Sequence, residues 1–257
     1  MSIAIHDLVK TYGRFTAVNG VSLDVRPGEI HGFLGPNGAG KTTTLRMIAG
    51  LLKPSSGRIE VNGHDTGTEP EAAKASLGFI PDRPYIYEKL TAGEFLRFHG
   101  GLFGVNGHGG HSDNPIGARV SEMLDLFELG RWENELVESF SHGMKQRLVM
   151  SAAFLHRPRA VVVDEPMVGL DPRGARLIKD VFRKMSERGV AILMSTHTLE
   201  VAEEMCDRIS IILKGRIIAT GTVDEVKAMT GGSDVELTSV FLKLTGGSGL
   251  QEIDEIV

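Results

Sequence analysis

The sequence predicts an α/β fold: a core of alternating strands and helices, interrupted once by a helical subdomain. One observation behind this prediction is the short apolar segment 29–34, which leads through a glycine-rich stretch into 43–52, where apolar residues recur at helical spacing. Another is the continuous apolar run 160–163, which is typical of a central parallel strand buried on both faces. The predicted parts are a core over 1–82 and 158–225, a helical subdomain over 83–157 and a short tail over 226–257.

Strands dominate the first part of the chain, where short apolar stretches are bounded by turn residues. They lie at 3–8, 21–25, 29–34, 58–61 and 77–80. Asn62-Gly63 closes the fourth of them with a strong signal for a tight turn. Tyr12 follows the first strand, where its ring could pack in the core or offer a stacking face to a base.

The helical subdomain begins with a capping signal. Thr91 and Glu94 have the spacing of a capping box, which predicts a helix from this point. Apolar residues at i, i+3, i+4 and i+7 from Val120 predict a second helix that stops at Gly130. The glycine-rich stretch 104–113 contains two histidines without a carboxylate or thiolate framework, so we interpret it as a surface loop.

Alternation of strands and helices resumes after the subdomain. Asp171-Pro172 combines an N-cap with a proline at the first helical position, which predicts the start of a helix. The apolar run 190–195 predicts the next buried strand. Segments 209–213 and 216–220 flank Lys214-Gly215 and predict a hairpin.

Composition limits the classes of function. The chain has 257 residues and ordinary apolar and charged fractions, 41% and 24%. A net charge of −5 offers no basic footprint, so we expect no nucleic-acid partner. A single cysteine indicates a reducing compartment, and no run of 18 apolar residues or signal-peptide pattern is present. We therefore expect a cytoplasmic protein.

Residues 35–42 match the phosphate-binding pattern G-x-x-x-x-G-K-[ST]. Glycines let several backbone N–H groups approach polyphosphate oxygens, and the following helix directs its positive dipole end at the same oxygens. Lys41 would reach the β- and γ-phosphates, and the Thr42 hydroxyl would bind Mg²⁺. A chance glycine-rich turn is the alternative, which the flanking strand and helix disfavour. The predicted nucleotide-binding residues are Gly35, Pro36, Asn37, Gly38, Ala39, Gly40, Lys41, Thr42 and Thr43.

A second group of polar residues follows the buried strands. Asp164 and Glu165 come directly after the run 160–163, and His197 follows the next strand. Ligands bind at the carboxyl ends of strands in α/β sheets, so all three residues would face the nucleotide. Asp164 suits a Mg²⁺ shell, and Glu165 could orient or deprotonate the attacking water. For His197 the alternative is an ordinary surface histidine.

Ser141 opens a third predicted site. It precedes a helix that runs to about residue 154, so its hydroxyl and the neighbouring N–H groups form another anion-binding position. One subunit with one phosphate loop has no need of a second phosphate-binding position. Such a position is explained if it binds the nucleotide of a neighbouring copy.

These motifs, in this order, resemble the ATP-binding subunits of ABC transporters over about residues 2–225. The resemblance implies a P-loop NTPase core with a RecA-like parallel sheet, an N-terminal antiparallel β part and an inserted helical subdomain, using ATP and Mg²⁺. It also implies roles: Tyr12 stacks on adenine, Asp164 and Glu165 are Walker B and the catalytic glutamate, Asp171 lies in the D-loop and His197 is the switch histidine. The residues in the position of the family signature, which would act on the partner's nucleotide, are Ser141, His142, Gly143, Met144 and Gln146.

Finer features resemble the branch that drives two-component drug, antibiotic or natural-product exporters. They are the segments 80–87 and 240–245 and the Met-Lys-Gln form of the signature. The chain departs from the family pattern at Asp82, which stands where most members have the glutamine of the Q-loop, and at His142, where glycine or lysine is usual. Asp82 is either a Mg²⁺ ligand or the first residue of a turn.

The resemblance implies a subunit that works as a head-to-tail dimer with two ATP between its halves. It would power a separate integral-membrane permease from the inner face of the cell membrane, as a homodimer or as a heterodimer with a paralogue. A soluble ABC ATPase acting on ribosomes or DNA is the alternative, but such proteins usually carry two nucleotide domains or long coiled coils and basic surfaces. A regulatory module without turnover is disfavoured by Glu165 and His197.

Overall fold

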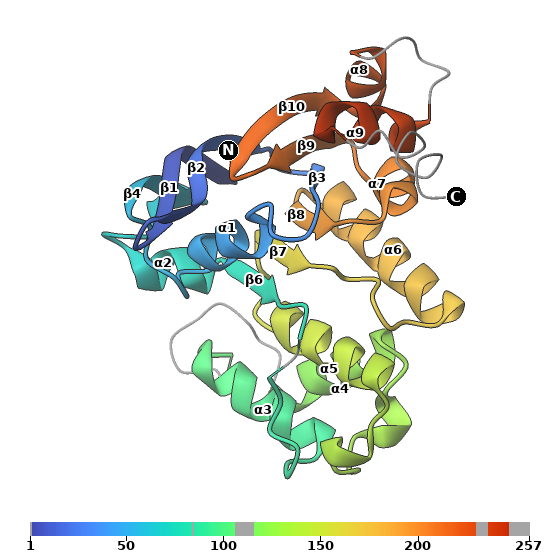
Figure 1. Cartoon of the computed structure of the whole chain (residues 1–257). Coiled ribbons are helices and arrows are strands. Elements are labelled where there is room, and N and C mark those ends of the chain that lie inside the picture. Colours follow the sequence, from blue (N-terminus) through green and yellow to red (C-terminus); the bar gives the residue numbers. More distant parts are fainter. Residues whose placement is uncertain (1, 84, 106–115, 230–235, 247–257) are drawn as a thin grey trace.

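A computed structural model describes residues 2–83, 85–105, 116–229 and 236–246. Two β-sheets lie on either side of helix α1 (Lys41–Ile48), and the helices between β6 and β7 form a separate lobe (Figure 1). The predicted α/β class and the inserted helices are confirmed. The glycine-rich stretch interpreted as a surface loop lies mostly outside the described residues.

The N-terminal sheet is antiparallel, as expected. Its strand order is β2-β1-β4-β5. The strands are β1 (Ile3–Tyr12), β2 (Phe15–Val25), β4 (Ser56–Val61) and β5 (His64–Asp65). The first two are longer than predicted: Tyr12 is the last residue of β1 and pairs with Phe15, because Gly13 permits a tight hairpin. Asn62 and Gly63 both have positive φ, as the predicted turn requires.

The central sheet has the order β10-β9-β3-β8-β7-β6. Its strands are β3 (Ile30–Leu34), β6 (Leu77–Ile80), β7 (Ala160–Asp164), β8 (Ala191–Thr196), β9 (Arg208–Leu213) and β10 (Arg216–Thr222). All neighbouring strands are parallel except the β9–β10 hairpin. The predicted parallel core sheet is thus confirmed, with one antiparallel strand at its edge.

Both faces of the central sheet are covered, which explains the continuous apolar strands. Val161 and Val163 pack among the helices, whereas Val162 on the opposite face packs with α1 and the N-terminal sheet. All three are fully buried. Burial of each such side chain contributes roughly 1.5–3 kcal/mol. A strand buried on both faces therefore needs no alternation of polar and apolar residues.

The inserted lobe contains three α-helices among its described residues: α3 (Ala92–Leu102), α4 (Ile116–Leu126) and α5 (His142–Phe154). Thr91 and Glu94 form the predicted capping box. The expected end of the second helix at Gly130 is wrong, because α4 ends at Leu126. Glu128 adopts a left-handed φ of 57°, and Gly130 begins a short 3-10 helix, Gly130–Trp132.

Four further helices were expected only in part. They are α6 (Pro172–Glu187), α7 (Leu199–Met205), α8 (Val223–Ala228) and α9 (Leu237–Thr245). The N-cap Asp171 of α6 was predicted, whereas α2 (Pro70–Ala75) and α7 are too short to show a helical period.

The predicted boundary at residue 225 falls inside α8, whose Val226 is buried in the core. Within the described ranges no helix is long and apolar enough to cross a membrane.

Candidate functional site

Four parallel strands of the central sheet end at one edge (Figure 1), and the phosphate loop, Asp82, Asp164, Glu165 and His197 lie at or just after these ends. Leu34 of β3 is level with Thr196 of β8, and Asp164 of β7 is level with Ser195. Ile80 of β6 pairs with the residue before Asp164. The segments that follow these strands therefore emerge together, at the carboxyl ends where α/β sheets bind ligands.

At two of its glycines, Gly35 and Gly40, the loop between β3 and α1 runs too close to its neighbours for a side chain. A Cβ on Gly35 would lie 2.4 Å from the backbone oxygen of Ile212, and one on Gly40 would lie 2.6 Å from that of Ala17. Gly40 also has a φ of 111°. Glycine is therefore required at Gly35 by the close backbone contact, and at Gly40 by both the close contact and the positive φ.

The start of α1 offers unused hydrogen-bond donors. The N–H groups of Gly40, Lys41, Thr42 and Thr43 donate to no acceptor in the described part of the chain. The first N–H groups of a helix have no partner inside the helix, and its dipole makes this end positive. A phosphate group fits this position.

Lys41 is fixed at the centre of the loop. Its Nζ donates to the backbone oxygen of Gly35 at 2.6 Å and to that of Pro36 at 3.4 Å. Burial lowers the pKa of the ammonium group below its ordinary value, while the charges of Glu165 and Asp164 partly oppose that shift. Lys41 is only 7% exposed, so its charge acts in a poorly hydrated place, where its attraction to phosphate is strong.

Ser195 fixes the carboxylate of Asp164, the last residue of β7, and the backbone of Glu165, which follows it. Its hydroxyl donates to Oδ1 of the buried Asp164 and accepts the backbone N–H of Glu165 at 3.2 Å. Asp164 therefore has a fixed orientation with one carboxylate oxygen free for another ligand. Ser195 was not among the predicted site residues. The only signal in the sequence was a hydroxyl residue at the end of the apolar run 190–195.

Glu165 and His197 form a pair. His197 Nδ1 lies 2.9 Å from Glu165 Oε1. Glu165 has a left-handed φ of 52°, which costs roughly 1–3 kcal/mol for a residue other than glycine and is held by its N–H bonds to Ser195. Strain of this kind is typical of sites that must aim a side chain. The arrangement suits a general base oriented by a histidine.

Asp82 and Tyr12 are the residues predicted to contact the metal ion and the adenine. Asp82 follows β6 and accepts the backbone N–H of Arg83 at 2.8 Å through Oδ1, which leaves Oδ2 available. This contact is compatible with both predicted roles, the turn and the metal ligand.

Tyr12 is half exposed at the end of β1, with Lys10 Nζ 5.2 Å from its ring centre. Pro84 lies outside the described residues.

The signature segment caps α5 as expected. Ser141 is the N-cap, and its Oγ accepts the N–H of Met144 at 3.3 Å. Gln146 is 1% exposed, and its Oε1 has no partner in the described structure. His142 lies against Gly169, where a Cβ would be 2.3 Å from the imidazole Cδ2. The signature and the D-loop thus touch within one chain, a contact that the sequence did not reveal.

Asp171 has a structural task of its own. Its Oδ1 accepts the N–H of Gly174 at 2.9 Å and caps α6. The contact between His142 and Gly169 lies just before this cap. The D-loop is therefore held at one end by α6 and touched at the other by the signature.

The donor set at this edge suits Mg²⁺. Thr42, Asp164 and Asp82 offer hard oxygen ligands, and Mg²⁺ is commonly bound by one or two carboxylates together with phosphate oxygens. No cluster of three or more His, Cys, Asp or Glu side chains that could hold a metal occurs among the residues that the structure describes. Bound there, the ion would neutralise phosphate charge.

Comparisons with known proteins decide the family. Residues 18–168 match the family model described as ABC transporter. The chain is 38% identical over 229 residues to the linearmycin resistance ATP-binding protein LnrL of Bacillus subtilis, covering 89% of this chain and 72% of that protein. The chain belongs to the ABC transporter family. It is an ABC ATPase, and the predicted resemblance is confirmed.

A second relative is also named for drug resistance, and two solved structures of ABC cassettes have a similar fold. The daunorubicin resistance ATP-binding protein DrrA3 of Streptomyces coeruleorubidus is 38% identical, covering 92% of this chain and 73% of the relative. A solved structure of an ATP-binding subunit of an ABC transporter has a TM-score of 0.88 and 33% identity, covering 95% of this chain and 99% of that one. A dimeric, post-hydrolysis cassette bound to ADP and phosphate has a TM-score of 0.76 and 25% identity, covering 86% and 98%.

Proposed function

We propose that this ABC ATPase hydrolyses Mg²⁺-ATP with Glu165 as general base and His197 as its orienting partner. The observation that carries the proposal is the 2.9 Å contact between these two residues at the sheet edge that also presents Lys41. Lys41 and the free N–H groups at the start of α1 bind the phosphates. Thr42 and Asp164 hold Mg²⁺, and Tyr12 stacks on adenine.

The active form in this proposal is a head-to-tail dimer in which Ser141 and Gly143 grip the partner's γ-phosphate. The N-terminus of α5 supports this dimer because it is a second position that could bind phosphate. There the N–H groups of His142 and Gly143 donate to no acceptor in the described part of the chain. The post-hydrolysis cassette with a similar fold is dimeric. Because His142 touches Gly169, binding of the partner's nucleotide would reach the D-loop of the same chain.

The dimer would power a separate membrane permease and export a drug or natural product. Two similar proteins are named for resistance to linearmycin and daunorubicin, and export is the transport direction that explains resistance. The subunit would then lie on the inner face of the cell membrane through its permease. Purification of the tagged chain from its native cells tests this: a co-purifying integral-membrane protein is expected, and a ribosome or DNA complex instead would contradict it.

The docking surface for the permease would be the segment after β6. Tyr85 and Tyr87 are 87% and 60% exposed, and the Tyr87 ring packs edge-on against Phe98 at 5.5 Å. Glu88 next to them forms an ion pair with Lys145 of the signature helix at 2.5 Å. Movement of a bound permease helix would therefore be passed to α5. Exposed apolar groups of this kind commonly mark interaction sites.

Replacing Tyr85 and Tyr87 by Ser is expected to leave the basal ATPase rate of the isolated subunit unchanged but to abolish transport by the assembled transporter. Both side chains are mostly solvent-exposed, so their loss costs the subunit little stability. Leu51→Ser, at a 64% exposed position after α1 and outside the segment that follows β6, is the matched control and should transport normally. Full transport by the double tyrosine variant would rule out this docking surface.

For Asp82 we propose ligation of Mg²⁺, directly or through water, by the oxygen that Arg83 does not engage. Asp82→Asn keeps an oxygen acceptor for the Arg83 N–H but removes the charge. We expect the Mg²⁺ concentration for half-maximal ATPase to rise, since carboxylates are the harder ligands, with metal-free nucleotide binding little changed. If the Mg²⁺ dependence of Asp82→Asn overlays that of the parent, Asp82 serves only the turn.

A further inference from the structure

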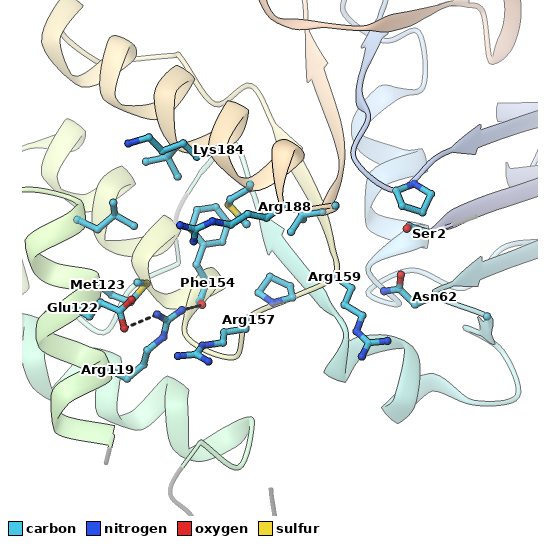
Figure 2. A pocket seen from close by; sticks show the side chains of 18 residues that line it. Ser2, Asn62, Arg119, Glu122, Met123, Phe154, Arg157, Arg159, Lys184 and Arg188 are labelled. Atoms are coloured by element: carbon cyan, nitrogen blue, oxygen red, sulfur yellow. Dashed lines mark hydrogen bonds and ion pairs between the residues drawn. The ribbon is translucent and has the colours of Figure 1, made fainter. Parts of the chain in front are cut away.

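A pocket unrelated to the phosphate loop lies at the opposite edge of the central sheet. Pro158 and Arg159, which precede β7, and Val190, which precedes β8, line it, so it opens at the amino ends of the strands. Its volume is about 1300 Å³. Helices α4 and α6, the end of α5 at Phe154, and Pro27 and the Asn62-Gly63 turn beside the N-terminal sheet form its other walls, and Figure 2 shows the side chains that line it. The pocket thus spans the boundary between the inserted lobe and the core.

Positive charge is concentrated in this pocket. Its cationic lining residues are Arg119, Arg157, Arg159, Lys184 and Arg188. Glu122 is the only carboxylate among the lining residues, whereas the whole chain carries a net charge of −5. A local excess of cations on an acidic protein raises the concentration of anions at that place.

One of these cations is fixed and the others have no counter-ion. Arg119 is 8% exposed, donates to the backbone oxygens of Phe154 and Leu155 at 2.8 and 3.2 Å, and pairs with Glu122 at 2.7 Å. The remaining four form no ion pair with any residue in the described ranges. Their charges are available to a ligand.

The charges stand at separate places around an apolar wall. In Figure 2 Arg119 and Arg157 lie at one end, Arg159 lies at the other end near Asn62, and Arg188 extends over Phe154 between them. Phe154 and Met123 are buried side chains that face this space. A bare inorganic anion would leave the apolar wall exposed to water.

We propose that this pocket binds an elongated organic anion that carries at least two phosphate or carboxylate groups on an apolar body. Guanidinium groups match the planar geometry of both oxyanions through paired N–H donors. The volume of about 1300 Å³ is larger than that of most small-molecule sites, roughly 300–1,000 Å³, and leaves room for an elongated ligand. A ligand that contacts Arg157, which follows α5 of the inserted lobe, and Arg188, the C-cap of α6 in the core, would join the lobe to the core and stabilise their relative position.

Calorimetric titration tests the proposal with the whole chain saturated with Mg²⁺ and a non-hydrolysable ATP analogue, so that the phosphate loop is occupied. The probes are adenosine 3′,5′-bisphosphate, naphthalene-2,6-dicarboxylate and inorganic pyrophosphate. Binding of the first or the second identifies phosphate or carboxylate as the preferred group, and either supports the proposal. Pyrophosphate, which lacks the apolar body, is expected to bind at least ~10-fold more weakly than the better organic probe.

The variants Arg188→Gln and Arg159→Gln should each weaken binding of that probe by ~10-fold, the usual effect of losing a charge-assisted hydrogen bond. Arg176→Gln, on helix α6, which Arg188 caps, and outside the pocket lining, is the matched control and should bind normally. Thermal melting of each variant without the probe verifies folding. The proposal is overturned if neither organic probe binds below ~1 mM, if pyrophosphate binds as well as they do, or if both arginine variants bind like the parent.

Discussion

Glu165→Gln is expected to bind ATP normally and to hydrolyse it roughly 10²–10⁴-fold more slowly, the usual contribution of a general base. The amide retains the size of the side chain and can still accept a hydrogen bond from His197, which lies 2.9 Å from the carboxylate in the parent. It cannot accept a proton from the attacking water. Phosphate release under saturating Mg²⁺-ATP measures the loss.

The same variant should accumulate as a dimer on a sizing column when ATP is present, because hydrolysis is what separates the subunits in the proposed cycle. Glu187→Gln, at the exposed end of α6, removes one negative charge elsewhere and serves as the control. Normal turnover by Glu165→Gln would exclude Glu165 as the base. A variant that is slow but remains monomeric with ATP would contradict the dimer.

Lys41→Ala is expected to lower ATP affinity by at least ~10-fold, since a charge-assisted hydrogen bond contributes roughly 1.5–3 kcal/mol. The effect should be at the upper end of this range because Lys41 is 7% exposed, which strengthens its interaction with phosphate. Titration of the folded variant with ATP measures it. Lys53→Ala, an exposed lysine beyond α1, should bind ATP like the parent.

Loss of the Lys41 side chain also removes its hydrogen bonds to Gly35 and Pro36, so the loop itself could rearrange. Lys41→Arg separates the two effects. It keeps the charge but does not fit the same two carbonyl acceptors, so its affinity should lie between those of parent and alanine variant. ATP affinity of Lys41→Ala equal to that of the parent would refute the role of the loop.

The sequence predicted those parts of the fold whose signals are local. The capping box at Thr91 and the buried strand 160–163 are fixed by side chains next to one another in the chain. The end of α4 was missed because Glu128, not a glycine, adopts the left-handed conformation that terminates it. The short helix α7 was missed because seven residues give too few turns for a period.

At the site, sequence motifs located the strand ends but not the contacts between them. The hydrogen bonds of Ser195 to Asp164 and Glu165 join neighbouring strands, and only the register of β7 against β8 brings these residues together. The contact of His142 with Gly169 likewise depends on how α5 packs beside the loop that precedes α6. Such long-range pairs leave no mark in local spacing.

Mixing two inactive variants tests most directly whether each ATP is held between two copies of the chain. Lys41→Ala disables the phosphate loop but leaves the signature intact. Gly143→Asp places a negative charge at the signature, where a Cβ meets its nearest atom at an ordinary 3.5 Å, so the fold is spared.

Each variant alone should hydrolyse little ATP. In an equal mixture, half of the dimers contain both variants, and each of these has one complete site, so about a quarter of the parent rate should return. Hydrolysis that stays at the level of the separate variants, under conditions where the subunits exchange, would contradict a site shared between two copies.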